Sequence, residues 1–218
     1  MLITYKLIVI LIFVVFMFFI SDFRNKRTKP LIRQPWLGIM RVGYPIAPLS
    51  FSIFLITAEE LFALDYVALS LIIIGTLVVI ISKMALGKSH SWVGFSSLEI
   101  DDFCNTGIYS WIRHPLYVGI ITAVLGTAFF VIPRGLEKPY LFIVYLIGTL
   151  FTFTFIANSS VKETEYLTEK FCEEYSNYQN QVSAFFPYKK LKLNLKRLEQ
   201  LKLKPYTVST GDNCIGVF

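Results

Sequence analysis

The composition of this 218-residue chain excludes an ordinary soluble globular protein. Hydrophobic residues make up 55% of it and its mean hydropathy is +0.58, whereas soluble domains are roughly 45–50% apolar. The net charge of +6 and the pI near 9.2 are values also found in nucleic-acid-binding proteins. The basic residues, however, cluster just outside apolar segments, so they indicate membrane topology and no nucleic-acid partner.

Five apolar segments have the length and composition expected of membrane-spanning helices. The first ends at Ile20, and we expect an uncleaved anchor because residues 21–24 offer no small-x-small cleavage site of a signal peptide. Glu59 and Glu60 close the second segment beside Asp65, where we expect a solvated loop rather than buried functional acids. The segments are Leu2 to Ile20, Gly43 to Leu64, Tyr66 to Leu86, Leu116 to Ile132 and Pro139 to Ala157.

Lysine and arginine gather in two regions, residues 24–41 and residues 189–204. By the positive-inside rule both regions face the cytoplasm. The sequence therefore predicts an all-α, multi-pass membrane protein with its N-terminus outside and its C-terminus inside. We divide it into N-terminal membrane helices (1–86), a core (87–187) and a basic to polar tail (188–218).

Neither a metal site nor a disulfide is expected. The three cysteines, Cys104, Cys172 and Cys214, have no paired spacing. The chain also contains no GxGxxG sequence, phosphate-binding loop or metal-ligand cluster.

A cytoplasmic helix is predicted after the fifth span, from Val161 to Val182. Its apolar residues recur at steps of three and four, and Glu163 lies at the membrane-proximal end of the same face. They are Leu167, Phe171, Tyr175, Tyr178 and Val182. Periodicity alone favours an amphipathic helix that rests on the lipid surface.

Two motifs flank the last pair of spans. Residues 105–119 read NTGIYSWIRHPLYVG, and Glu163 is followed by an aromatic series that ends at Phe186-Pro187. The first resembles the signature T-G-x-Y-x-x-x-R-H-P-x-Y-x-G of the isoprenylcysteine carboxyl methyltransferase and phospholipid methyltransferase superfamily. The second resembles the downstream signature of the same group, and the resemblance extends from about Ala85 to Pro187.

The resemblance implies S-adenosylmethionine as cofactor and a lipid-like or isoprenoid methyl acceptor. It places the cofactor at the cytoplasmic end of the membrane hairpin, under the C-terminal helix. For Arg113 two roles remain open, contact with the cofactor or substrate and contact with phosphate headgroups. The positions that line the cofactor in related enzymes correspond here to Tyr109, His114, Pro115, Leu116, Tyr117 and Glu163.

The acceptor is less well specified. Isoprenylcysteine enzymes have a substrate-binding arginine four residues before the glutamate, and this chain has Ser159 there, which argues against a prenylcysteine carboxylate. We identify no general base, which favours an acceptor that is already nucleophilic, such as a carboxylate or thiolate. Two alternatives stay open: an NADPH-dependent membrane sterol-type reductase with a related Arg-His-Pro-x-Tyr element, and a non-catalytic scaffold of the same fold.

Overall fold

The computed structural model describes residues 1–20, 28–32, 35–87, 95–97 and 103–192. The described part is almost entirely helical, as predicted. Two short strands, β1 (Thr28–Pro30) and β2 (Phe95–Ser97), pair antiparallel with Lys29 opposite Ser96. The helices are α1 (Leu2–Ile20), α2 (Trp36–Gly43), α3 (Ile46–Thr57), α4 (Ala63–Leu86), α5 (Pro115–Val131) and α6 (Pro139–Gln181).

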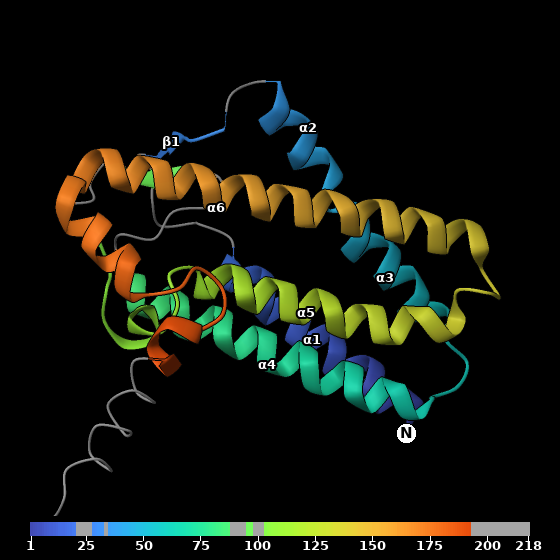
Figure 1. The fold of residues 1–218 in the computed structure, drawn as a ribbon. Coiled ribbons are helices and arrows are strands. Elements are labelled where there is room, and N and C mark those ends of the chain that lie inside the picture. Colours follow the sequence, from blue (N-terminus) through green and yellow to red (C-terminus); the bar gives the residue numbers. More distant parts are fainter. Residues whose placement is uncertain (21–27, 33–34, 88–94, 98–102, 193–218) are drawn as a thin grey trace, which may run out of the picture.

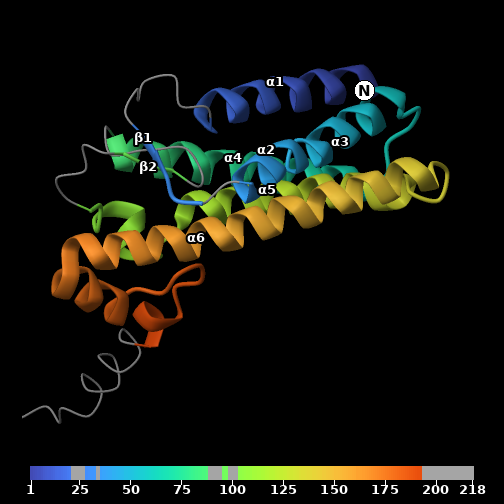
Figure 2. The same cartoon turned by 90° about the horizontal axis from the view of Figure 1, so that it is seen from above.

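The long helices lie side by side and run between the same two ends of the molecule (Figures 1 and 2). One end carries the N-terminus, the α3–α4 connection and the turn between α5 and α6; we call it the hairpin end. The other carries the start of α5 and the polar last part of α6; we call it the motif end, because the Arg-His-Pro sequence lies there.

Four helices are long and apolar enough to cross a membrane, so the chain is a multi-pass integral membrane protein. They are α1, α4, α6, and α5 with the short 3₁₀ turn Ile132–Arg134 that extends it. The second predicted segment differs from expectation. Within it the main helix is only the 12-residue α3, which is separated from the preceding α2 at Tyr44 and Pro45, because proline lacks the N–H that would continue the helical ladder.

Helices α4 and α5 approach closely enough for backbone to touch backbone. A Cβ on Gly75 would lie 2.5 Å from the nitrogen of Ala123 and 2.6 Å from the carbonyl oxygen of Gly119. Likewise, a Cβ on Gly126 would lie 2.8 Å from the carbonyl oxygen of Ala68. Glycines at these positions therefore permit the close approach of α4 and α5.

The prediction of a separate helix from Val161 onward was wrong. α6 (Pro139–Gln181) continues from the membrane segment through this point and stays helical as far as Cys172, because two of the polar residues near its middle bond to carbonyls of their own helix. Asn158 donates to the carbonyl of Thr154 and Ser160 to that of Ala157, at 2.8 and 2.9 Å. The chain turns instead at Cys172, whose φ of 46° is non-helical.

The hairpin end is only partly the solvated loop that was expected. Glu59 and Glu60 are exposed, but Asp65 is fully buried and is held by Arg134. Asp65 also accepts a hydrogen bond from the backbone N–H of Phe62 at 2.8 Å and so caps the start of α4. One acid of the three is thus part of the packed structure.

Candidate functional site

The Arg-His-Pro motif is held in place by the segment that follows α6. The backbone N–H of Arg113 donates to the carbonyl of Ser183 at 2.8 Å, and that of His114 donates to Ala184 at 3.0 Å. Pro115 then occupies the first turn of α5, where its missing N–H costs no hydrogen bond. The end of α6 and the start of α5 are therefore fixed to each other through the backbone.

His114 is the centre of the polar cluster at the motif end. Its side chain is 4% exposed and lies between two residues of α6. Nδ1 is 3.4 Å from a carboxylate oxygen of Glu163, and Nε2 is 3.2 Å from the hydroxyl of Thr164. On its faces the ring stacks on Tyr117 at 5.4 Å between centroids and contacts Phe185. The imidazole is thus held at both ring nitrogens and packed against two aromatic rings.

Glu163 keeps the capacity to bind a further donor. Its side chain is 36% exposed, and the 3.4 Å separation from His114 is longer than the roughly 2.9 Å of a good N–H···O hydrogen bond. A carboxylate offers about four lone-pair sites. The open part of this carboxylate can therefore accept from a cation or an N–H group.

Arg113 brings a positive charge to the same cluster. Among the described residues its buried Nε and Nη1 atoms have no hydrogen-bond partner. Tyr175, in the polar last part of α6, lies near the charges of both Arg113 and Glu163. Burial and Glu163 raise the pKa of its hydroxyl, and Arg113 lowers it. Because a buried N–H without a partner is costly, these guanidinium atoms are suited to an anionic ligand.

An aromatic layer covers the cluster. Phe103 lies among the rings of Phe171, Tyr175 and Tyr178, at 5.3, 5.1 and 5.3 Å between centroids. Tyr178 donates a 2.6 Å hydrogen bond to the carbonyl of Tyr109. These contacts attach the last part of α6 to the segment that precedes Arg113.

Tyr109 is buried beneath that layer. Burial raises the pKa of its hydroxyl well above 10, and the nearby charge of Glu163 raises it further. The hydroxyl is therefore protonated at neutral pH and is available as a hydrogen-bond donor.

The structure brings together five of the seven residues that the sequence indicated: Tyr109, Arg113, His114, Tyr117 and Glu163. The other two, Pro115 and Leu116, are buried in structural positions. Leu116 belongs to an apolar cluster with Ile120 and Phe155, so neither presents a polar group to the site.

Sequence reasoning missed Thr164, Phe103 and the Ser183–Ala184 segment. Thr164 directly follows Glu163, and both side chains contact His114. Its position beside Glu163 was the signal that could have identified it. Ser183 and Ala184 pair with Arg113 and His114 through backbone atoms alone, so their side chains give no sequence signal for this pairing. Among the residues that the structure describes, no group of three His, Cys, Asp or Glu could hold a metal ion.

Residues 64–174 match the sequence profile of the family described as phospholipid methyltransferase. The match begins in α4, contains the first motif and the beginning of the second, and covers half of the chain. The chain belongs to the phospholipid methyltransferase family. Membership of this family favours the methyltransferase interpretation over the reductase.

One relative of this chain is the protein-S-isoprenylcysteine O-methyltransferase of Saccharomyces cerevisiae. The two are 29% identical over 119 residues, which is 54% of this chain and 46% of the yeast protein. The match thus spans less than half of the relative's length. It supports the same superfamily that the two motifs indicated.

Proposed function

We propose that this protein transfers a methyl group from S-adenosylmethionine to a lipid-like acceptor at the motif end. The observation that carries the proposal is the contact of His114 with Glu163 and Thr164. It joins the two family motifs in one partly open polar cluster, inside the region that matches the family.

The residues of this cluster fit the cofactor that the family implies. S-adenosylmethionine carries an ammonium group, a carboxylate, an adenine ring and a sulfonium whose methyl carbon is electrophilic. Glu163 would accept from the ammonium group, and the unpartnered guanidinium nitrogens of Arg113 would bind the carboxylate. Tyr109 and Tyr117 supply the aromatic surface that favours a cation. The opposite charges of Arg113 and Glu163 suit a zwitterion.

The chain's own contribution to the reaction is positioning and exclusion of water. His114 is not suited to act as a base towards the acceptor, because Glu163 and Thr164 lie against its two ring nitrogens. We therefore propose an acceptor that arrives as a nucleophile, a carboxylate or a thiolate. Ser159 is fully buried, so this position does not offer the substrate contact that an arginine makes in isoprenylcysteine enzymes.

We also propose five membrane crossings, with the N-terminus outside and the motif end in the cytoplasm. The second crossing would be made by α3 with part of α2. The alternation of helix directions between the two ends (Figure 1) and the basic residues near the motif end support this topology. The acceptor would then enter from the cytoplasmic half of the bilayer.

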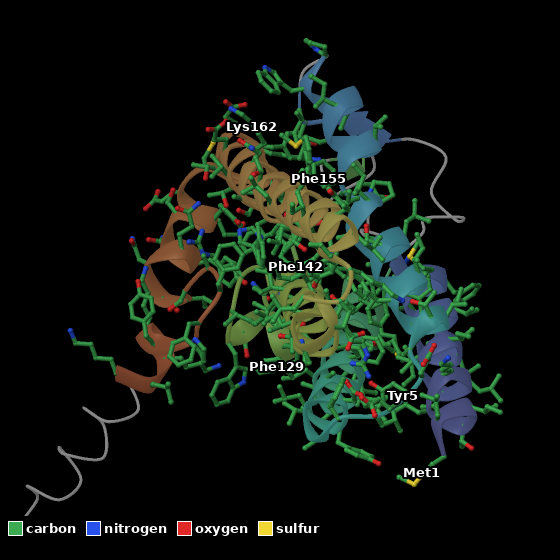
Figure 3. All side chains as sticks on the ribbon, turned by 90° about the vertical axis from the view of Figure 1, so that its right-hand side faces the viewer. Met1, Tyr5, Phe129, Phe142, Phe155 and Lys162 are labelled. Carbon is green, nitrogen blue, oxygen red and sulfur yellow. The ribbon has the colours of Figure 1, made fainter. Side chains whose placement is uncertain are left out.

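Calorimetry on detergent-purified protein tests the proposal, with S-adenosylmethionine and NADPH as separate ligands. We compare Glu163→Gln with Glu165→Gln. The carboxylate of Glu165 binds Lys162 at 2.6 Å on an exposed face, and Lys162 lies at the rim of the bundle seen from the hairpin end (Figure 3).

The wild type and Glu165→Gln should bind S-adenosylmethionine alike, and Glu163→Gln should bind at least tenfold more weakly. That factor corresponds to about 1.4 kcal/mol, within the range for a charge-assisted hydrogen bond. Binding of NADPH instead of the methyl donor would refute the proposal. So would equal loss of binding in the two variants.

A further inference from the structure

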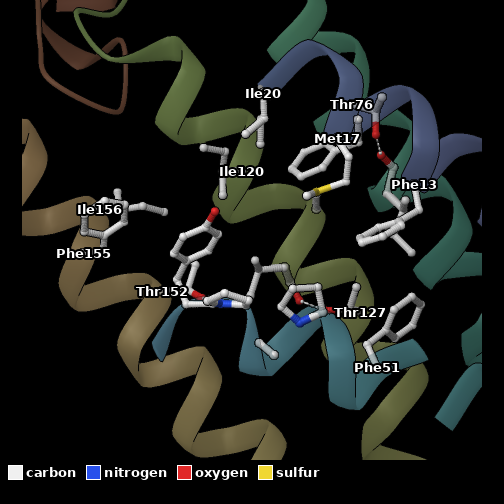
Figure 4. Close-up of a pocket in the computed structure, with 18 of the residues that line it drawn as sticks. Phe13, Met17, Ile20, Phe51, Thr76, Ile120, Thr127, Thr152, Phe155 and Ile156 are labelled. Atoms are coloured by element: carbon white, nitrogen blue, oxygen red, sulfur yellow. Dashed lines mark hydrogen bonds between the residues drawn. The ribbon is translucent and has the colours of Figure 1, made fainter. Parts of the chain in front are cut away.

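A hollow lined by apolar side chains lies within the membrane part of the bundle. It is an apolar cavity of about 150 Å³ between α1, α3, α4, α5 and α6. Figure 4 shows Phe13, Met17 and Ile20 of α1 on one side and Thr152, Phe155 and Ile156 of α6 on another. The cavity lies among helices that we treat as spanning the bilayer, so its natural occupant is a hydrocarbon chain.

The cavity begins directly below the polar cluster. Ile120 lines it and follows His114 by less than two turns of α5, which is about 9 Å at 1.5 Å per residue. Ile156 lines it and precedes Glu163 by about two turns of α6. A molecule whose reactive head lies at the polar cluster could therefore place its apolar tail in the cavity.

The cavity as it stands is too small for a whole lipid tail. A cavity of about 150 Å³ accommodates a ring of the size of benzene, whereas the chain of a membrane lipid is several times longer. One wall must move for the chain to enter fully.

Most of the walls are tightly packed. Gly75 of α4 lies against the backbone of α5, and a Cβ on Gly148 of α6 would lie within 2.3 Å of the nitrogen of Ala47 in α3. Opening either interface would separate backbones that touch over several turns.

α1 is packed in a different way. Its only buried residues are Tyr5 and Val9, both in the half that lies at the hairpin end. There the hydroxyl of Tyr5 donates to the carbonyl of Asp65 at 2.9 Å, and Lys6 donates to the carbonyls of Ile56 and Ala58 at 2.8 and 2.7 Å.

The other half of α1, from Phe13 to Ile20, lines the cavity but contains no buried residue. We propose that this half is a lateral gate: it swings away, with α1 pinned at Tyr5 and Lys6, and admits the hydrocarbon tail of the methyl acceptor from the bilayer. This inference rests on the proposed function in one respect only: it identifies the hydrocarbon tail as that of the methyl acceptor.

The test uses phosphatidylcholine with a diazirine in the middle of a palmitoyl chain, in nanodiscs that contain the 218-residue chain. After illumination, mass spectrometry compares labelling of Ile156, which lines the cavity, with labelling of Leu150, which is 67% exposed on the same helix. The ratio separates a chain inside the cavity from bulk lipid around the protein.

A matched pair of variants tests occupancy. Val124 lines the cavity, while its neighbour Leu125 is 45% exposed and does not line it. Val124→Trp should lower the Ile156 to Leu150 ratio at least fivefold, and Leu125→Trp should leave it unchanged. Equal ratios in the two variants would overturn the inference.

A pair of cross-links tests the gate, in a chain with all three cysteines replaced by serine. A bis-maleimide between Phe13→Cys and Thr76→Cys, which both line the cavity, should abolish labelling of Ile156. The same link between Lys6→Cys and Ala58→Cys replaces an existing contact and should not change it. Undiminished labelling with the first link would overturn the gate.

Binding of S-adenosylmethionine is measured on each variant in parallel. The substituted positions lie outside the polar cluster, so binding should stay as in the wild type. If the wild type is labelled as expected but binds no methyl donor, the proposed function fails while the lipid gate stands. If it binds the donor but Ile156 is not labelled above Leu150, the gate fails while the proposed function stands.

Discussion

The guanidinium of Arg134 and the carboxylate of Asp65 face each other in a two-pronged ion pair, with N···O distances of 2.7 and 2.8 Å. Both side chains are almost completely buried at the hairpin end. Arg134 also donates to the carbonyls of Phe130 and Glu60, and its charge lies 3.9 Å from the centre of the Phe130 ring. The pair therefore joins the α3–α4 connection, the start of α4 and the end of α5.

Replacing one member of this pair should destabilise the protein strongly. Arg134→Met leaves the carboxylate of Asp65 buried without its counter-charge, which costs about 3–5 kcal/mol. Unfolding in mixed micelles of mild detergent and SDS measures this loss. The double variant Asp65→Asn/Arg134→Met removes both charges and should regain at least half of it. A double variant as unstable as Arg134→Met alone would contradict this account.

Thr164→Val tests the positioning of His114. It removes the hydroxyl that lies 3.2 Å from Nε2 and retains the shape of the side chain. Loss of one such hydrogen bond costs about 1 kcal/mol, so we expect S-adenosylmethionine to bind about fivefold more weakly. Thr154→Val is the control, because that hydroxyl donates to the carbonyl of Leu150 within its own helix. A comparable decrease in the control would point to a general effect on α6.

The sequence predicted the helical membrane architecture because long apolar segments are unambiguous, and it predicted the polar cluster because two motifs resemble a known superfamily. It did not predict the continuity of α6. Asn158, Ser159 and Ser160 read as a break between helices, yet in the folded chain Asn158 and Ser160 bond to the carbonyls of their own helix.

The same limit explains Asp65. Glu59, Glu60 and Asp65 lie close together in the sequence. Which of them is buried depends on which one has a basic partner. That partner, Arg134, is 69 residues away in the chain. Arg134 lies in Pro133-Arg134-Gly135, between the fourth and fifth predicted segments, and this sequence reads as an ordinary turn. Pairing between distant residues was therefore accessible only from the three-dimensional structure.

Two glycine substitutions separate steric exclusion from backbone conformation. Gly75→Ala places a methyl group against backbone atoms of α5 that cannot rotate away, so α4 and α5 must separate, at a cost of about 1–3 kcal/mol or more. Gly107 has a φ of +56° but nothing within 4 Å of a Cβ. Gly107→Ala should therefore cost only the conformational penalty of about 1–2 kcal/mol.

These two variants should also differ in where they act. Gly75→Ala should lower the yield of monodisperse protein in fluorescence-detected size-exclusion chromatography. Gly107→Ala lies in the short 3₁₀ turn of the first motif and should weaken cofactor binding with little effect on yield. Ser70→Ala, at an exposed position of α4, is the control for the first. The account fails if Gly75→Ala matches that control.

Ser159 offers the most direct test of how this chain differs from isoprenylcysteine enzymes. Its side chain is fully buried, and within the described part of the chain its hydroxyl has no hydrogen-bond partner. Ser159→Ala removes a polar group that gains nothing from burial, so it should be neutral or stabilising. Ser159→Arg introduces an unpaired charge into a packed position and should destabilise the protein by several kcal/mol. Thermal melts in detergent compare the two. A stable Ser159→Arg variant that gains methyl transfer to a prenylcysteine analogue would show instead that this position opens towards the acceptor, and that the serine alone limits the choice of substrate.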